Sequence, residues 1–176
     1  RYSWRVLRAG EFRLDGGSMF GVVPRVVWSR NVPSDERGRI TVQHNCLLLR
    51  RVDATPGAAG LSGTPTAAAP TAAGATRPPP RTVVIETGTG DKLDDKSRDL
   101  FAMERRSIID ALRDAGNAPE SVDAVVVSHL HFDHAGGLTR VCREGETPDW
   151  TGPAGGMAGS RPDHGVKRTF PSARVY

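Results

Sequence analysis

The sequence predicts a mixed α+β fold, because strand-like and helix-like segments alternate before a histidine-rich loop. The segments 82–87 and 123–128 are short and rich in β-branched residues, which is typical of strands covered on both faces. Between them, residues 106–115 place apolar side chains at helical spacing. This strand–helix–strand order indicates a sheet with a helix packed on one of its faces.

The N-terminal region is predicted as a β-hairpin followed by a loop. Apolar and polar residues alternate on both sides of Ala9 and Gly10, which are suited to a turn. Residues 19–24 form an apolar segment with glycine and proline at its joints, and we expect a loop that covers the core or lines a pocket. Residues 40–50 are predicted as a strand.

Residues 54–80 differ in composition from the rest of the chain. They are almost entirely Ala, Pro, Thr and Gly, with one charged residue, Arg77, and one large apolar residue, Leu61. Such a segment cannot bury enough apolar surface to offset the entropy lost on ordering it. We therefore predict a disordered insert in a hairpin, because the cost of closing a loop grows slowly with its length. Residues 1–176 as a whole are expected to form one partial domain.

The helix over 106–115 has a predicted start and a predicted end. Ser107 and Asp110 resemble a capping box, and Gly116 suits the position just after a helix. The charged residues 91–98 are predicted as a surface loop.

Composition excludes several classes of protein. The chain of 176 residues is long enough for one domain, and it contains no run of apolar residues long enough to span a membrane. Its net charge is +4 without a block of like charge, so neither a nucleic acid nor a membrane is an expected partner. The two cysteines cannot form a disulfide framework, which favours a reducing compartment, and we expect a cytoplasmic protein.

The residues with the strongest chemical signal lie in segment 128–137, directly after a predicted strand. His129 and His131 are two positions apart, so an extended backbone projects both rings to one side. Asp133 and His134 follow on a backbone that must turn, and the glycines after them allow that turn. Imidazoles and a carboxylate in this pattern suit a pair of Zn²⁺ ions or similar divalent metals.

The pattern His129-x-His131-x-Asp133-His134 matches the signature of the metallo-β-lactamase superfamily. Further segments resemble the same family, and two of them resemble the opening of its hydrolase and lactonase branch. These segments are 83–88 and 45–48 for the superfamily, and 14–17 and 20–24 for the branch.

The resemblance implies an αβ/βα metallo-β-lactamase sandwich with its metals at one edge, between two sheets. The chain begins at Arg1 and ends on a strand-like segment, so we expect only the N-terminal half of that fold, truncated before the second half. In the family the second half supplies further metal ligands. Glu86 stands where the family usually has Asp, which predicts a different environment beneath the site.

The resemblance also assigns the ligands and the cofactor. His129 and His131 would bind the first metal, and Asp133 and His134 the second. Two Zn²⁺ ions are expected in a complete site, with Fe or Mn as alternatives. Asp133 would in addition act as the catalytic carboxylate that accepts or relays a proton of the attacking water.

Other residues receive a structural interpretation, with a ligand role left open for two of them. His164 and Cys142 could join a metal site. The favoured interpretation is that His164 is a solvated loop histidine and that Cys142 is an inert thiol. His44 and Cys46 are expected to pack within a strand. Met19, with its aromatic neighbours, could line a pocket or pack in the core.

The function expected first is that of a metal-dependent hydrolase, in which a metal-activated hydroxide attacks an ester, a lactone or a similar bond of a small-molecule substrate. An iron-dependent redox enzyme of the same fold is the alternative, because spacing does not distinguish Zn²⁺ from Fe²⁺. A truncated, inactive fragment with an incomplete metal site is a third possibility. Half a sandwich leaves one sheet face uncovered, so association of the chain, for example as a homodimer, is expected.

Overall fold

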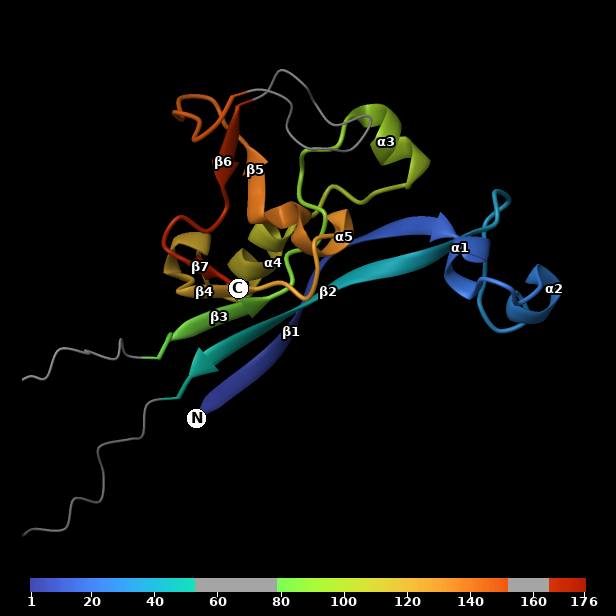
Figure 1. Ribbon diagram of the computed structural model, residues 1–176, viewed down its shortest axis with the longest axis horizontal. Helices are drawn as coiled ribbons and strands as arrows, with labels where there is room; N and C mark the ends of the chain where they lie inside the picture. The colour runs from blue at the N-terminus through green and yellow to red at the C-terminus, as the bar shows by residue number, and fades with distance from the viewer. Residues whose placement is uncertain (53–78, 152–164) are drawn as a thin grey trace, which may run out of the picture.

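The computed structural model describes residues 1–52, 79–151 and 165–176. Its main layer is a five-stranded mixed sheet in the order β1-β2-β3-β4-β7, and β5 and β6 form a separate antiparallel pair (Figure 1). The first three strands of the large sheet pair antiparallel, whereas β4 joins β3 and β7 joins β4 in parallel. The strands are β1 (Tyr2–Asp15), β2 (Arg39–Arg51), β3 (Thr82–Ile85), β4 (Ala124–Val126), β5 (Thr139–Val141), β6 (Val166–Arg168) and β7 (Arg174–Val175).

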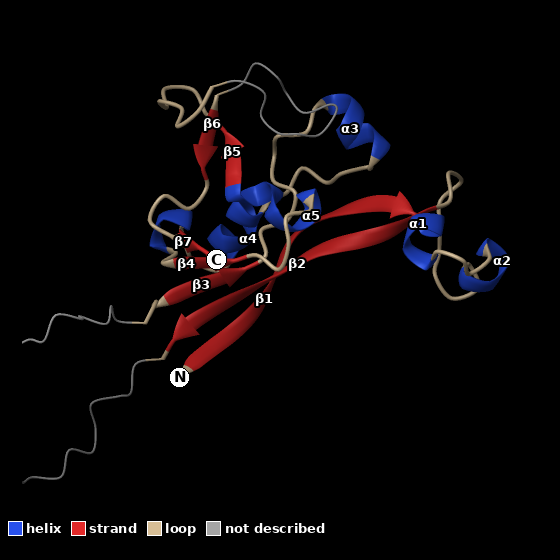
Figure 2. Cartoon of the chain, viewed as in Figure 1, coloured by secondary structure: helices blue, strands red, loops and turns tan. Residues whose placement is uncertain are grey.

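The helices are short and fall into two groups. Figure 2 shows α1 and α2 at the far end of the β1–β2 ribbon, while the other helices lie over the sheet and beside the β5–β6 pair. None of the described helices is long and apolar enough to cross a membrane. The helices are α1 (Gly16–Phe20), α2 (Arg25–Trp28), α3 (Asp95–Leu100), α4 (Ile108–Asp114), α5 (Phe132–Ala135) and the 3₁₀ turns η1 (Pro119–Ser121) and η2 (Gly136–Leu138).

The prediction of a hairpin within residues 2–14 is wrong. These residues form one continuous strand that pairs with β2 along its whole length, except where the register shifts between Arg8 and Glu11. Ala9 and Gly10 lie in that shift, so they make a β-bulge instead of a turn. Gly10 has a positive φ of 133°, and Ala9 is buried in the core, which keeps the strand on the sheet.

The helix predicted over 106–115 is present as α4. Asp110 accepts hydrogen bonds from the backbone N–H and the hydroxyl of Ser107, as the capping box predicted. The side chains of Ile108 and Leu112 are fully buried against the sheet. They join the main core, which also contains Leu7, Ala9, Cys46, Leu48, Val84, Ala111, Val122, Val125 and Phe170.

The two β-branched segments also fold as predicted, because β3 and β4 lie within 82–87 and 123–128 and pair in parallel. Val84 and Val125 are paired across these two strands, and both are completely buried in the core on the face that α4 covers. The prediction of a surface loop over residues 91–98 is wrong in part. Asp94 caps α3 by accepting a hydrogen bond from the backbone of Ser97, so a short helix begins within that range.

The predicted insert 54–80 and the histidine His164 lie almost entirely outside the described residues. The strands that precede and follow the insert, β2 and β3, are antiparallel neighbours with Leu48 opposite Val84.

Candidate metal centre

The histidine-rich segment leaves the sheet at the carboxyl end of β4. An extended stretch carries His129 and His131, and α5 begins directly afterwards and carries Asp133 and His134. His129 and His131 are exposed, while Asp133 and His134 are half-buried against the molecule. A short extended segment followed by a tight turn therefore brings together residues that are also close in sequence.

The four predicted ligands lie together. The ring centroids of His129 and His131 are 4.6 Å apart, and those of His129 and His134 are 4.0 Å apart. A carboxylate oxygen of Asp133 lies 3.5 Å from Nε2 of His134. Imidazole nitrogens and carboxylate oxygens are common ligands of zinc in proteins.

The donors are nevertheless not arranged as a closed metal site. Within residues 1–52, 79–151 and 165–176, no group of three or more His, Cys, Asp or Glu side chains is placed to hold one ion. Two ring nitrogens already face protein atoms, because Nδ1 of His129 lies 3.0 Å from the hydroxyl of Ser128 and Nδ1 of His134 faces Glu86. The residues fit a metal in donor type and proximity, but they form only part of a coordination shell.

Glu86 supports the segment from β3. One carboxylate oxygen accepts a hydrogen bond of 3.0 Å from Nδ1 of His134, and the other accepts one of 3.0 Å from the backbone N–H of Ser128. Burial favours the neutral form of this carboxyl, but the hydrogen bonds from Ser128 and His134 outweigh it and hold the pKa of Glu86 below its usual range. Glu86 itself adopts a positive φ of 65°, which is uncommon for a residue other than glycine.

The glycines after the motif are required by close backbone contacts. The sequence predicts that they permit a turn. In the structure, a Cβ atom on Gly136 would lie 2.3 Å from the carbonyl oxygen of Thr89, and one on Gly137 would lie 2.2 Å from that of Thr87. The backbone N–H and hydroxyl of Thr87 donate to the carbonyl of His134 at 2.9 and 2.7 Å. The loop after β3 is therefore fastened directly to the turn that carries the ligands.

Lys92 is a second supporting residue that sequence reasoning missed. Its ammonium group donates to the carbonyl oxygens of Gly136, the first residue of η2, and Thr139, the residue after η2. Burial lowers the pKa of Lys92 to about 8, against the opposing effect of Asp91. A single lysine in a charged segment carries no sequence signal for such a role.

A cavity of about 270 Å³ opens beside the candidate centre, with Asp133, His134 and Glu86 in its wall. Met19 contributes exposed apolar surface to the same cavity, and the buried ring of Phe12 lies behind its wall. Met19 therefore lines a pocket, which is one of the two positions that the sequence allows for it. Its aromatic neighbours instead pack together, with ring centroids of Phe20 and Trp28 5.0 Å apart.

His44 and Cys46 have the structural environments that the sequence favoured. The His44 ring is buried, stacks on Phe12 with centroids 4.7 Å apart, and has Nε2 at 3.0 Å from the hydroxyl of Thr89. Burial lowers the pKa of His44, with smaller and opposing effects from Asp133 and His134. Burial also raises the pKa of the Cys46 thiol to about 12, so this cysteine packs as a small apolar residue.

Comparisons with solved structures show the same fold. A probable metal-dependent hydrolase from Staphylococcus aureus is 30% identical, with a TM-score of 0.58 over 80% of this chain and 42% of that one. The dizinc quorum-quenching lactonase AidC and the hydrolase AbOPH of the beta-lactamase superfamily are each 16% identical. Their TM-scores are 0.51 and 0.50, over 99% of this chain and 41% and 40% of theirs.

The chain thus spans about 40% of the length of these solved structures, as expected for part of the fold. No curated protein matches it significantly. The sequence profile of the metallo-beta-lactamase superfamily matches residues 77–175, which is more than half of the chain and includes the whole histidine-rich motif. The chain therefore belongs to the metallo-beta-lactamase superfamily.

Proposed function

We propose that this chain supplies part of a dinuclear zinc centre, and that the protein containing it is a hydrolase of esters, lactones or similar bonds in small molecules. The observation that supports the proposal is the convergence of three imidazoles after β4, with ring centroids 4.0 and 4.6 Å apart. A carboxylate lies next to them, so both donor types of a zinc hydrolase are present.

Each ligand has a proposed task. His129 and His131 would hold the first ion, and Asp133 and His134 the second. Glu86 fixes the ring of His134 through Nδ1, which leaves Nε2 as the nitrogen free to bind an ion. This orientation by a carboxylate is a common way to set the tautomer of a metal-binding histidine.

Bound divalent ions would lower the pKa of a water molecule and make hydroxide available near neutral pH. Asp133 would accept or relay the proton, and the position of its carboxylate beside both His134 and the neighbouring cavity supports this role. The exposed apolar surface of Met19 in that cavity suits the hydrocarbon part of an ester or lactone. The preference for lactones also rests on the fold shared with AidC, which is an argument by analogy.

Hydrolysis by the zinc-loaded product of the full reading frame tests the proposal. A series of lactones and aryl esters serves as substrates, with Asp133→Asn as the test variant and Asp99→Asn as its control, because the side chain of Asp99 is 83% exposed. We expect Asp133→Asn to lower kcat/KM about 100-fold or more, as for loss of a general base, and Asp99→Asn to leave it unchanged. Wild-type kcat/KM in Asp133→Asn, or no hydrolysis of any substrate by the wild type, contradicts the proposal.

A further inference from the structure

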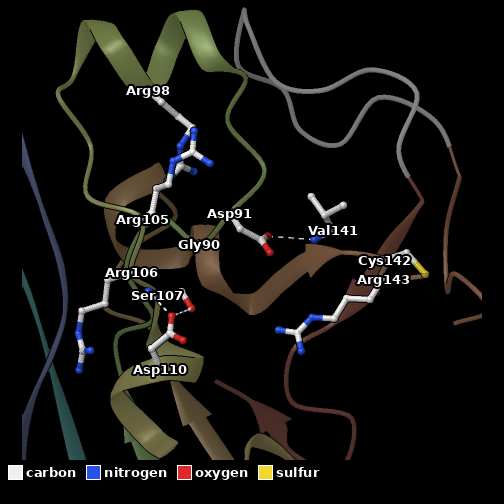
Figure 3. A pocket seen from close by; sticks show the side chains of 10 residues that line it. All are labelled: Gly90, Asp91, Arg98, Arg105, Arg106, Ser107, Asp110, Val141, Cys142 and Arg143. Atoms are coloured by element: carbon white, nitrogen blue, oxygen red, sulfur yellow. Dashed lines mark hydrogen bonds between the residues drawn. The ribbon is translucent and has the colours of Figure 1, made fainter. Parts of the chain in front are cut away.

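A second cavity, of about 370 Å³, lies between α3, the beginning of α4 and the end of β5. Its wall is rich in charged side chains, because four arginines and two aspartates line it. Figure 3 shows these residues around the cavity. They are Arg98, Arg105, Arg106, Arg143, Asp91 and Asp110.

Two of these guanidinium groups are unpaired in the part of the chain that the structure describes. Neither Arg105 nor Arg143 has an ion pair or a side-chain hydrogen bond to a described residue. Arg106 differs, because it donates to the carbonyl of Arg8 at 2.9 Å and to the carboxylate of Asp114 at 2.6 Å. Arg105 and Arg143 are therefore the groups with hydrogen-bonding capacity to offer a ligand.

The two carboxylates of the wall are already occupied. Asp91 accepts a hydrogen bond of 2.9 Å from the backbone N–H of Val141, and Asp110 accepts two of 2.9 Å from the backbone and hydroxyl of Ser107 (Figure 3). These bonds hold the acids to the frame of the cavity. The wall itself carries four arginines against two aspartates and so has an excess of positive charge, while Asp114 and Arg113, which lie outside the wall, pair with Arg106 and Asp110.

We propose that this cavity binds a phosphate group, either as inorganic phosphate or as a phosphate monoester. Figure 3 shows the Arg105 side chain beside Arg98 and the Arg143 side chain on the other side of Asp91, and both line the cavity, so a phosphate bound there can accept hydrogen bonds from unpaired guanidinium groups. A phosphate monoester carries a charge of about −1.5 to −2 at neutral pH, which matches the excess positive charge better than a monoanionic carboxylate does. No group of the candidate metal centre takes part in this site.

Calorimetric titration of the full chain with inorganic phosphate, at constant ionic strength, tests the proposal. We expect saturable binding, and a Kd that is at least about tenfold weaker in Arg105→Gln and in Arg143→Gln, because each loses a charged hydrogen-bond donor. Arg30→Gln is the matched control, since Arg30 is an exposed arginine outside the cavity, and its Kd should equal that of the wild type. A titration with glycerol phosphate distinguishes a monoester from the free anion.

Two further measurements keep the result interpretable. Arg143→Lys preserves the charge but not the planar fork, so we expect phosphate binding between that of the wild type and Arg143→Gln. Circular dichroism must show the wild-type spectrum for each variant that loses binding. The proposal is overturned by the absence of saturable binding, by equal Kd values in wild type, Arg105→Gln and Arg143→Gln, or by acetate binding as tightly as phosphate.

Discussion

Glu86 shows how a single residue can prepare a metal ligand. Its carboxylate bridges the backbone of Ser128 and the ring of His134, which lie on either side of His129 and His131 in the histidine-rich segment. The sequence marked Glu86 only as a departure from the usual Asp of the family. Its partner His134 lies 48 positions away in sequence, and the two meet only because β3 and β4 are parallel neighbours.

Glu86→Gln should weaken zinc binding. The amide retains the shape of the side chain but no longer presents a charged acceptor to His134, and loss of such an orienting carboxylate lowers metal affinity about 10- to 100-fold. Competition with a zinc-binding dye measures the change. Glu120→Gln, at an exposed site outside the centre, is the control. An unchanged zinc affinity in Glu86→Gln means that Glu86 does not orient His134.

His44 should make the folded state sensitive to acid. Because burial lowers its folded pKa below 6.5, the unfolded chain binds a proton at pH values where the folded chain does not. The free energy of unfolding therefore falls as pH decreases below 6.5, by at most about 1.4 kcal/mol per pH unit for one proton. His44→Gln should reduce this slope in urea unfolding between pH 7 and pH 5, and an unchanged slope contradicts the assignment.

Among the helices and strands, the local sequence pattern predicts those whose own residues specify their structure without reference to a distant segment. The helical spacing and capping box identified α4, and the β-branched runs identified β3 and β4. For β1, the local pattern predicts a hairpin instead of the observed strand, because Ala9-Gly10 fits a turn as well as a bulge. Pairing with β2, which begins at Arg39, decides between them, and that contact is not encoded in the N-terminal segment alone.

The turn that links α5 to β5 should tolerate no side chain at Gly137. In Gly137→Ala the new methyl group would meet the carbonyl of Thr87, a backbone atom that cannot move without shifting the loop after β3. We expect a loss of about 1 to 3 kcal/mol in the free energy of unfolding, as for overpacking, together with weaker zinc binding.

Gly17→Ala provides the comparison in denaturant unfolding. The nearest atom there is a side-chain oxygen of Asp15 at 2.9 Å, which caps α1 by accepting a hydrogen bond from Ser18, so we expect a smaller loss than at Gly137, where backbone lies at 2.2 Å. Equal stability of Gly137→Ala and Gly17→Ala would show that the contact between the two loops is not tight.

Across the whole molecule, one face of the main sheet is covered by α4 and the core, while the other keeps apolar side chains exposed. Trp4 is 70% and Val6 is 53% exposed, and their cross-strand neighbours Leu49 and Leu47 are half-buried. Apolar surface of this kind favours association. We therefore propose that this chain forms homodimers through the face around Trp4 and Val6.

Light scattering across a concentration series tests this proposal. Trp4→Lys should shift the chain toward a monomer, because a charge on the contact face opposes its burial. Val22→Lys serves as the control, since Val22 is 100% exposed in the loop after α1 and lies outside this face. A wild-type chain that stays monomeric at every concentration contradicts the proposal.

Metal content per chain tests most directly whether His129, His131, Asp133 and His134 bind metal. Elemental analysis of the purified protein should find stoichiometric zinc, and His129→Ala/His131→Ala should lose it, whereas His164→Ala should retain it. Equal zinc in the wild type and the double variant, or no metal in either, would contradict the account. Stoichiometric iron in place of zinc would contradict the hydrolase assignment and favour redox chemistry.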